Sequence, residues 1–564
     1  MRTCLLAFVV MTVVGYAQER ASDGSTRADW PHYGGTVRSW RYSALDQINT
    51  TNVKNLGPAW IFQTGEYANG LLSTPIVVDG VMYLSTPRSQ VFALDAATGR
   101  VLWNYRHTLR PNYGLAGGMT SFLQNRGVAV ADGKVFVGTT DSQLIAIDQK
   151  TGREVWKVVV DDSRQCGCTI PSAPLVVKDK VIVGQSGGDQ AHRGHLTAFS
   201  TKTGRFAWRF YVIPGPGEPG NETWKGESWK YGGGAPWMTG SYDPELNLVY
   251  WGTGNAASDL YDGNRRVGDN NSPLGVNLYT GSVVALDADT GKLRWHHQEV
   301  PGDVWDFDSA YETLLIDREV RGRMRKLLLH MNKSGLTFVL DRETGEYISA
   351  FSVAENQTWI DGIGDRGELV GRKDPVVGRT INVCPSPFGA KSWNQMAYSP
   401  RTGLIYTPTL EICADLTARA QEPQEGRTYI GGAWEFKLPP NRDTYSHLDA
   451  VDPLTGKRVW SMPYRYLLMA SVLATAGDLV FTGDPEGNFF ALDAKTGSKL
   501  WSFQTGAGHR GSAIAYAVNG RQFVTTPTGW GSIAASTSSL FPGARETWRG
   551  GSAVVAFALP EGSK

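Results

Sequence analysis

The sequence has almost no excess of charge of either sign. Its 55 lysine and arginine residues are balanced by 54 aspartate and glutamate residues, which gives a net charge of +1 at pH 7. A surface that binds nucleic acid needs a basic face, so no nucleic-acid partner is expected. The sequence also lacks a C-x-x-C-H motif and a glycine-rich loop after a strand pattern. These absences argue against covalent haem c and against a nucleotide-binding loop.

Long apolar runs are absent beyond the N-terminus. A ten-residue apolar run, Leu5–Val14, follows Arg2 and precedes the small residues of Gly15–Ala17. This pattern predicts a cleaved signal peptide over residues 1–17 and export to the periplasm or the medium. The alternative is a short membrane anchor, but ten residues are too few to span a bilayer. No later segment is long and apolar enough, so we expect no membrane span in the mature chain, residues 18–564.

Cysteine is scarce, with five residues in the chain. Loss of the signal peptide leaves four, and an oxidising compartment permits them to form disulfides. Cys166 and Cys168 are separated by one glycine and could form a bridge or remain free thiols. No histidine is close to this pair in the pattern, which argues against a zinc site.

Glycine and aromatic residues are plentiful: 66 glycines, 19 tryptophans and 22 tyrosines. Turn-rich strands with aromatic residues favour an all-β protein. One motif also recurs, of the form A-L-D-x-x-T-G-x-x-x-W. Five clear copies and two degenerate ones occur, at Gln90–Trp103, Gln143–Trp156, His195–Trp208, Ser282–Trp295 and Asn488–Trp501, and at Leu336–Tyr347 and Leu448–Trp460.

Each copy predicts a β-hairpin. An alternating apolar strand leads to an aspartate that can accept hydrogen bonds from turn amides, and a glycine supplies the positive φ of the turn. A hairpin cannot bury its apolar face alone, so the units must pack around an axis, and the terminal tryptophan can dock on the next unit. The spacings from Trp103 to Trp156 and from Trp156 to Trp208, 53 and 52 residues, each fit a four-stranded unit.

The predicted fold is therefore all-β: one eight-bladed β-propeller of four-stranded antiparallel blades over residues 18–564. The last strand, Ala553–Leu559, is expected to pair with N-terminal strands and close the ring, which removes exposed sheet edges.

The repeat on an exported chain resembles that of the quinoprotein alcohol dehydrogenases, over nearly the whole mature chain. This resemblance implies a bound pyrroloquinoline quinone (PQQ) and a metal ion in the central channel. Trp237, within GGGAPWMTGSYDP, matches the tryptophan beneath the PQQ ring, where a flat aromatic partner is favourable. Other cofactor contacts implied by the resemblance are Arg126, which pairs with a PQQ carboxylate, Ser186, Gly187, Lys333 near the reactive carbonyl, and Trp530.

The resemblance also assigns metal ligands and a base. Asp189, where the family usually has the longer glutamate, and Asn255 offer the oxygen atoms that Ca²⁺ or a lanthanide prefers. Asp306 in WDFD matches the general base that removes the hydroxyl proton of an alcohol, and it also belongs to the metal site. Asp308 matches the extra carboxylate of lanthanide-dependent members. Alternation in a strand would place both carboxylates on one face.

Cys384 and Cys413 match the disulfide of the family, at a separation of 29 residues. Other positions depart from the pattern. The family's adjacent cysteine pair falls at Thr120–Ser121, and a Cys166–Cys168 bridge could take its place. Polar or aromatic cofactor contacts are replaced at Leu72, Pro171, Ala235, Ser392 and Met469.

Two hypotheses follow. In the first, the chain is a PQQ-dependent dehydrogenase that contains one Ca²⁺ or lanthanide ion, oxidises a small primary alcohol to an aldehyde and passes electrons to a separate acceptor such as a c-type cytochrome. Asp306 and Lys333 would be its catalytic residues. In the second, motivated by the departures, it is a non-catalytic propeller that serves as a binding scaffold. Absorption by bound quinone after reconstitution would distinguish them.

Overall fold

The structure is a computed structural model that describes residues 28–562 apart from residues 68, 115–122, 269–273 and 549. The predicted signal peptide, residues 1–17, lies outside the described residues, as does the pair Thr120–Ser121. No helix in the described part of the chain is long and apolar enough to cross a membrane. The helices are short: α1 (Ser163–Cys166), α2 (Ala544–Thr547) and the 3-10 helices η1 (Val53–Asn55), η3 (Asn221–Thr223), η4 (Ser228–Tyr231) and η5 (Ser532–Leu540).

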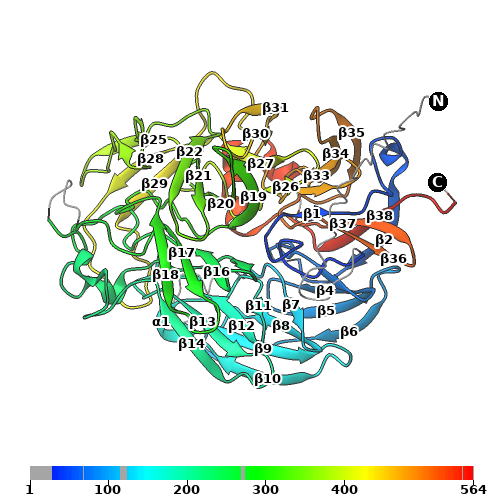
Figure 1. The fold of residues 1–564 in the computed structure, drawn as a ribbon, viewed down its shortest axis with the longest axis horizontal. Coiled ribbons are helices and arrows are strands. Elements are labelled where there is room, and N and C mark those ends of the chain that lie inside the picture. The colour runs from blue at the N-terminus through cyan, green and yellow to red at the C-terminus, as the bar shows by residue number, and fades with distance from the viewer. Residues whose placement is uncertain (1–27, 68, 115–122, 269–273, 549, 563–564) are drawn as a thin grey trace, which may run out of the picture.

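Eight sheets of four or five strands follow one another around a ring, and their number agrees with the eight predicted blades (Figure 1). In chain order they contain β3 (Ile76–Val78), β4 (Val81–Ser85), β5 (Val91–Asp95) and β6 (Val101–Tyr105); β7 (Ala129–Ala131), β8 (Lys134–Gly138), β9 (Gln143–Asp148) and β10 (Glu154–Val159); β11 (Leu175–Val177), β12 (Lys180–Gly184), β13 (His195–Ser200) and β14 (Phe206–Tyr211); β15 (Ser241–Asp243), β16 (Leu248–Gly252), β17 (Ser282–Asp287) and β18 (Leu293–Gln298).

The other four sheets continue the ring. They contain β19 (Leu314–Val320), β20 (Arg323–Met331), β21 (Leu336–Asp341) and β22 (Tyr347–Ser352); β26 (Ala397–Ser399), β27 (Leu404–Leu410), β30 (Ser446–Val451) and β31 (Arg458–Tyr464); β1 (Tyr42–Ser43), β32 (Leu473–Thr475), β33 (Leu479–Gly483), β34 (Asn488–Asp493) and β35 (Lys499–Gln504); β36 (Ile514–Val518), β37 (Arg521–Pro527), β38 (Ala553–Ala558) and β2 (Gly57–Gln63).

The predicted hairpin and its docking tryptophan are confirmed. In the turn between β5 and β6, the Asp95 carboxylate accepts the backbone N–H of Thr98 at 3.0 Å. Gly99 has a φ of +73°, and a Cβ there would lie 2.6 Å from the Trp60 ring of the preceding blade. Trp60 also donates its Nε1–H to the Ala96 carbonyl at 3.1 Å. Corresponding bonds join Trp103 to Gln149, Trp156 to Thr201, Trp208 to Ala288, Trp295 to Arg342, Trp460 to Ala494 and Trp501 to Leu56.

The ring closes as predicted, since β38 at the end of the chain pairs antiparallel with β2 near its start. Figure 1 shows the blue β2 and the red β38 side by side. The same sheet receives the Trp501 indole of the preceding blade, whose Nε1–H donates to Leu56 at 3.0 Å. Strands from the two ends of the described chain therefore form a single blade.

Two small sheets extend from the ring. One pairs β23 (Gly362–Ile363) with β24 (Leu369–Val370), and the other contains β25 (Thr380–Val383), β28 (Cys413–Ala418) and β29 (Gly432–Lys437). The predicted Cys384–Cys413 disulfide is confirmed and joins the end of β25 to the start of β28. The segment before β29 reaches the cavity described next, so this insertion contributes to the site.

Candidate active site

Loops from several blades converge on one cavity of about 420 Å³. Its volume lies in the range of cavities that hold a small-molecule ligand. Eight of the ten predicted cofactor and metal residues line it: Arg126, Ser186, Gly187, Asp189, Trp237, Asp306, Asp308 and Lys333. A larger cavity of about 670 Å³ contains none of them. The structure thus brings together predicted residues that are as far apart in the sequence as Arg126 and Lys333.

The two remaining residues lie beside the cavity. The backbone N–H of Asn255 donates to Asp308 Oδ1 at 3.1 Å, so Asn255 borders the carboxylate end. Trp530 packs against Trp548, with ring centroids 5.1 Å apart, in the apolar cluster that also contains Phe388 of the cavity wall. Trp530 is therefore adjacent to the wall and does not line this cavity.

A cluster of acidic side chains forms one end of the cavity. Lys333 Nζ lies 2.8 Å from Asp306 Oδ1 and 2.9 Å from Asp308 Oδ2. Burial lowers the pKa of Lys333, but the two carboxylates outweigh it and hold that pKa well above its ordinary value. Burial raises the pKa of Asp306 well above its usual range, although Lys333 opposes this effect. Burial and the charge of Asp308 raise the pKa of Asp189 to about 6.

The expectation that WDFD forms a strand is wrong. Asp306 has a φ of +61°, and the segment has no strand pairing. The buried Asp303 carboxylate shapes this loop because it accepts the backbone N–H groups of Trp305 at 2.9 Å and Phe307 at 2.7 Å. Asp306 and Asp308 are still brought together, because both carboxylates pair with Lys333 and not because they alternate along a strand.

Asp259 is an acidic residue of this end that the sequence analysis missed. Its carboxylate oxygen, one of Asp189 and one of Asp306 all lie within 4.8 Å of one another. Asn255 Nδ2 donates to Asp259 Oδ1 at 2.8 Å. The one available signal was its place four residues after Asn255, in GTGNAASD.

Two buried arginines form the other end of the cavity. Arg126 leaves Nε and Nη1 without a hydrogen-bond partner among the described residues, and Arg510 leaves Nε and Nη2 so. Burial lowers the pKa of Arg126 to about 10, and burial together with repulsion from Arg126 lowers that of Arg510 to about 9. Buried donors without partners are costly, so this end is built for an anion that supplies acceptors. Arg510 was not predicted, because nothing in its local sequence distinguishes it.

Aromatic rings form the wall between the two ends. The Arg126 guanidinium carbon lies 5.0 Å from the Trp237 ring centroid and 4.7 Å from that of Trp393. Trp237 donates its Nε1–H to Asp308 Oδ1 at 3.2 Å, and Tyr311 packs edge-on against it with centroids 5.5 Å apart. These contacts fix the plane of a flat surface that links the basic end to the acidic end.

The positions that depart from the family pattern are also near the cavity. Pro171 and Ser392 line it. Leu72 is buried in the cluster that contains Trp393 and Trp237, and Ala235 is buried beside the acidic end, near Gly188. Met469 is buried in the cluster of Trp530. The departures therefore change the side chains around the cavity without filling it.

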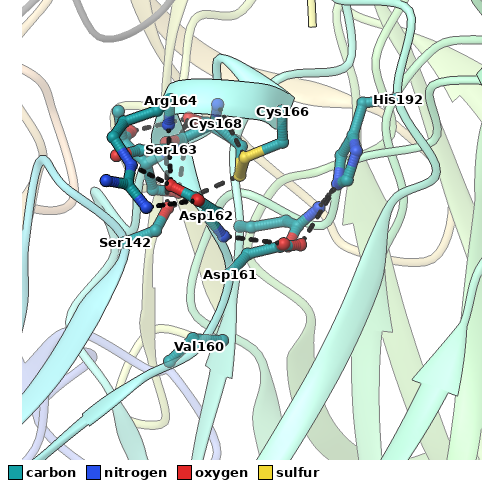
Figure 2. The surroundings of a disulfide bond; sticks show 12 residues. Ser142, Val160, Asp161, Asp162, Ser163, Arg164, Cys166, Cys168 and His192 are labelled. Carbon is teal, nitrogen blue, oxygen red and sulfur yellow. Dashed lines mark hydrogen bonds and ion pairs between the residues drawn. A yellow bond between two sulfur atoms is a disulfide. The ribbon is translucent and has the colours of Figure 1, made fainter. Parts of the chain in front are cut away.

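The Cys166–Cys168 pair forms a disulfide, which decides between the two alternatives (Figure 2). A Cβ on Gly187 would lie 3.2 Å from Cys168 Cβ, so the bridge supports the cavity wall directly. The expectation that no histidine is near is wrong: ligand atoms of both cysteines, His192 and Asp161 lie within 4.8 Å of one another. His192 is distant in sequence and arrives from the loop between β12 and β13.

Comparisons with known proteins agree with this geometry. The family model for the PQQ glucose/ethanol/alcohol dehydrogenase β-propeller domain matches residues 30–358 and 368–524. The chain is 38% identical to a quinohemoprotein alcohol dehydrogenase of Comamonas testosteroni, over 90% of this chain and 73% of that one. It is 36% identical to a lanthanide-dependent methanol dehydrogenase of Methylorubrum extorquens, over 87% and 85% of the two chains.

A solved structure is similar as well. A europium-containing methanol dehydrogenase superposes with a TM-score of 0.88 at 33% identity and covers 95% of this chain and 98% of its own. Together, the family model, the relatives and the superposition show that the chain belongs to the PQQ-dependent quinoprotein alcohol dehydrogenase family.

Proposed function

We propose that this chain oxidises a primary alcohol to an aldehyde with PQQ and one metal ion bound in the 420 Å³ cavity, and passes the electrons to a separate acceptor such as a c-type cytochrome. By its family, the chain is an oxidoreductase that acts on the CH–OH group of alcohols. The observation that best supports this proposal is the arrangement of charges along the cavity. Guanidinium nitrogens without partners lie at one end, clustered carboxylates lie at the other, and the flat Trp237 ring lies between them.

The residues present fit both groups. PQQ carries three carboxylates, and the unpartnered nitrogens of Arg126 and Arg510 can bind them as charge-assisted hydrogen-bond donors. The unpartnered Asn255 Oδ1 and the carboxylates of Asp189, Asp306 and Asp308 supply hard oxygen ligands for Ca²⁺ or a lanthanide. When bound, PQQ supplies the two-electron oxidant and the metal ion polarises its reactive carbonyl.

The protein's own part is proton transfer and positioning. Asp306 in its ionised form accepts the hydroxyl proton of the alcohol. Lys333, held at 2.8 Å from Asp306, stabilises negative charge that develops on the reacting oxygen. Three cavity-lining residues provide the surfaces that orient the quinone: Trp237, Ser186 and Gly187. Trp530 supports the wall from outside, in the apolar cluster that contains Phe388.

We also propose export to the periplasm or the medium. Residues 1–17 have the pattern of a signal peptide. The two disulfides, Cys166–Cys168 and Cys384–Cys413, suit an oxidising compartment. A separate electron acceptor fits the lack of a haem c motif in the sequence. N-terminal sequencing of the exported chain tests the cleavage after residue 17.

Reconstitution tests the activity. The mature chain is mixed with PQQ and either La³⁺ or Ca²⁺, and both quinone absorbance and alcohol-dependent dye reduction are recorded. Quinone binding with alcohol-dependent turnover supports the proposal. No binding with either metal would contradict it and support the alternative of a non-catalytic scaffold. The comparisons do not favour that alternative, since the relatives named above are dehydrogenases.

A further inference from the structure

Asp259 is a buried carboxylate that the alcohol oxidation proposed above does not use. It follows β16, and its side chain is inaccessible to solvent. Asp259 Oδ1 accepts a hydrogen bond from Asn255 Nδ2 at 2.8 Å, whereas Oδ2 has no partner among the described residues. A buried carboxylate oxygen without a donor is costly, and either protonation or a bound cation can offset that cost.

The Asp259 carboxylate lies in a cluster of acidic side chains at the cavity. Oxygen atoms of Asp259, Asp189 and Asp306 lie within 4.8 Å of one another, which is the spacing of ligands around one ion. Asp308 joins the same group through Lys333, at 2.9 Å from Nζ.

A second atom points to a ligand independently of the acidic residues. Asn255 Oδ1 is buried and has no hydrogen-bond partner among the described residues. It faces Gly188, where a Cβ would lie only 2.9 Å away, and Gly188 lines the cavity next to Asp189. The hydrogen bond from Asn255 Nδ2 to Asp259 fixes this amide so that its oxygen is turned toward Gly188. Asp259 thereby orients a neutral ligand atom and adds a charged one.

We infer that Asp259 is an additional ligand of the metal ion in this cavity, and that the four carboxylates of Asp189, Asp259, Asp306 and Asp308 select a trivalent lanthanide over Ca²⁺. The inference rests on the proposed function, which places a metal ion in the cavity. Asp189 is one methylene shorter than the glutamate usual at its position, and Asp259 supplies a further carboxylate from the segment that follows β16.

Charge balance supports the selection. With Lys333 protonated, four carboxylates and a trivalent ion carry no net charge, whereas a divalent ion leaves one negative charge uncompensated. Uncompensated charge in a buried site is strongly unfavourable, so the trivalent ion gains the larger binding free energy.

The test measures metal binding directly, on the full mature chain with and without PQQ. Tb³⁺ serves as the probe because its luminescence can be sensitised by nearby tryptophan, and La³⁺ and Ca²⁺ compete for it. We expect Asp259→Asn to raise the Kd for Tb³⁺ about tenfold or more, in the range seen for changes around metal sites, and to raise the Kd for Ca²⁺ less. Asp262→Asn is the matched control. It also removes one negative charge, three residues further along the chain, but Asp262 pairs with Arg266 outside the cluster.

A second readout covers the metal-free protein. Because Asp259→Asn removes repulsion among buried carboxylates, we expect it to raise the Tm of the metal-free chain and to reduce the further rise on adding La³⁺. Asp259→Glu, which keeps the charge, should retain most of the preference for Tb³⁺ over Ca²⁺. If Asp259→Asn does not fold, Asp259→Ala, which also removes the charge, replaces it in the Tb³⁺ and Ca²⁺ titrations, and an unchanged preference for Tb³⁺ overturns the role of Asp259.

The outcomes separate the two proposals. Unchanged Tb³⁺ binding by Asp259→Asn, in a protein that still oxidises alcohol, overturns the role of Asp259 and leaves the proposed function intact. Equal wild-type affinity for Tb³⁺ and Ca²⁺ overturns the selection of a trivalent ion. A wild-type chain that binds no metal and oxidises no alcohol overturns both the inference and the proposed function.

Discussion

Replacing Arg510 by methionine should stabilise the protein in the absence of PQQ and weaken its binding of PQQ. Arg510 is buried, and two of its guanidinium nitrogens have no partner among the described residues. Its charge is also repelled by Arg126. A group placed to bind a ligand is expected to be unfavourable before the ligand arrives, so one substitution should move stability and affinity in opposite directions.

The magnitude follows from the lowered pKa. A pKa of about 9 for Arg510, against the ordinary 12.5, corresponds to roughly 5 kcal/mol of penalty for holding the charge, at 1.36 kcal/mol for each pKa unit. The penalty applies in full at pH 7, because the penalty for a base with a lowered folded-state pKa is complete below that pKa. Imperfect packing of methionine offsets about 1–2 kcal/mol. The net gain of about 3–4 kcal/mol should raise the Tm by roughly 3–4 °C in a chain of this size.

The affinity for PQQ should change in the opposite direction. Loss of charge-assisted hydrogen bonds to a carboxylate costs about 1.5–3 kcal/mol, so the Kd for PQQ should rise roughly 10- to 150-fold. Thermal unfolding of the PQQ-free protein and titration of the quinone absorbance measure the two effects. Both measurements use the mature chain at pH 7 with La³⁺ present and absent.

Arg41 offers a matched control. It is also buried, but it donates to Val472 O at 2.9 Å, to Gln395 Oε1 at 2.9 Å and to Ala513 O. Arg41→Met leaves these acceptors unsatisfied and should lower stability by about 2–4 kcal/mol. If Arg510→Met destabilises the protein as Arg41→Met does and binds PQQ like the wild type, the reasoning about the basic end is refuted.

Three further predictions concern catalysis, pH and packing. Asp306→Asn should lower kcat by roughly 10²–10⁴-fold in the reconstituted enzyme while quinone absorbance persists; unchanged turnover would exclude Asp306 as the base. Burial lowers the pKa of His447, but two carboxylates at 2.6 and 3.1 Å outweigh it and raise the pKa to about 9. The stabilisation that this raised pKa provides is complete below about pH 6.5 and is lost as the pH rises through 9. The free energy of unfolding, measured with urea, should therefore fall by roughly 3 kcal/mol between these two pH values, and His447→Gln should abolish this fall. Gly291→Ala should lower the free energy of unfolding by about 1–3 kcal/mol more than Gly133→Ala. Both glycines have a positive φ near +70°, but a Cβ on Gly291 would lie 2.5 Å from the Trp208 ring, whereas one on Gly133 would meet nothing within 4 Å. Equal melting temperatures of the two variants would contradict the docking role of Trp208.

The fold was predictable because the residues that determine it lie close together in the sequence and recur in each repeat. Each hairpin carries its own aspartate, glycine and tryptophan, as in Asp95, Gly99 and Trp103, and each tryptophan donates a hydrogen bond to the next blade. Pairing of the last strand with the first ones followed from the need to remove sheet edges. These features depend on alternation and turn chemistry within about fifteen residues, which a sequence displays directly.

The site was only partly predictable because it depends on contacts between distant segments. Resemblance identified Asp306 and Lys333, but the loop conformation that joins them comes from Asp303, which lies outside the motif. Asp259 and Arg510 have no local signature; their significance appears only once their neighbours and missing hydrogen-bond partners are known. The same holds for His192, which reaches Cys166 and Cys168 through the fold rather than through the sequence.

The pairing of β2 with β38 sets the order of events during biogenesis. The first of these strands is synthesised early, whereas its partner is the last strand that the structure describes. Until β38 arrives, β2 and β37 each present an open edge, and open edges of this kind promote aggregation. Folding of this blade must therefore wait until β38 has been synthesised. A chain shortened by its last dozen residues would retain every residue of the cavity and yet remain an unclosed ring.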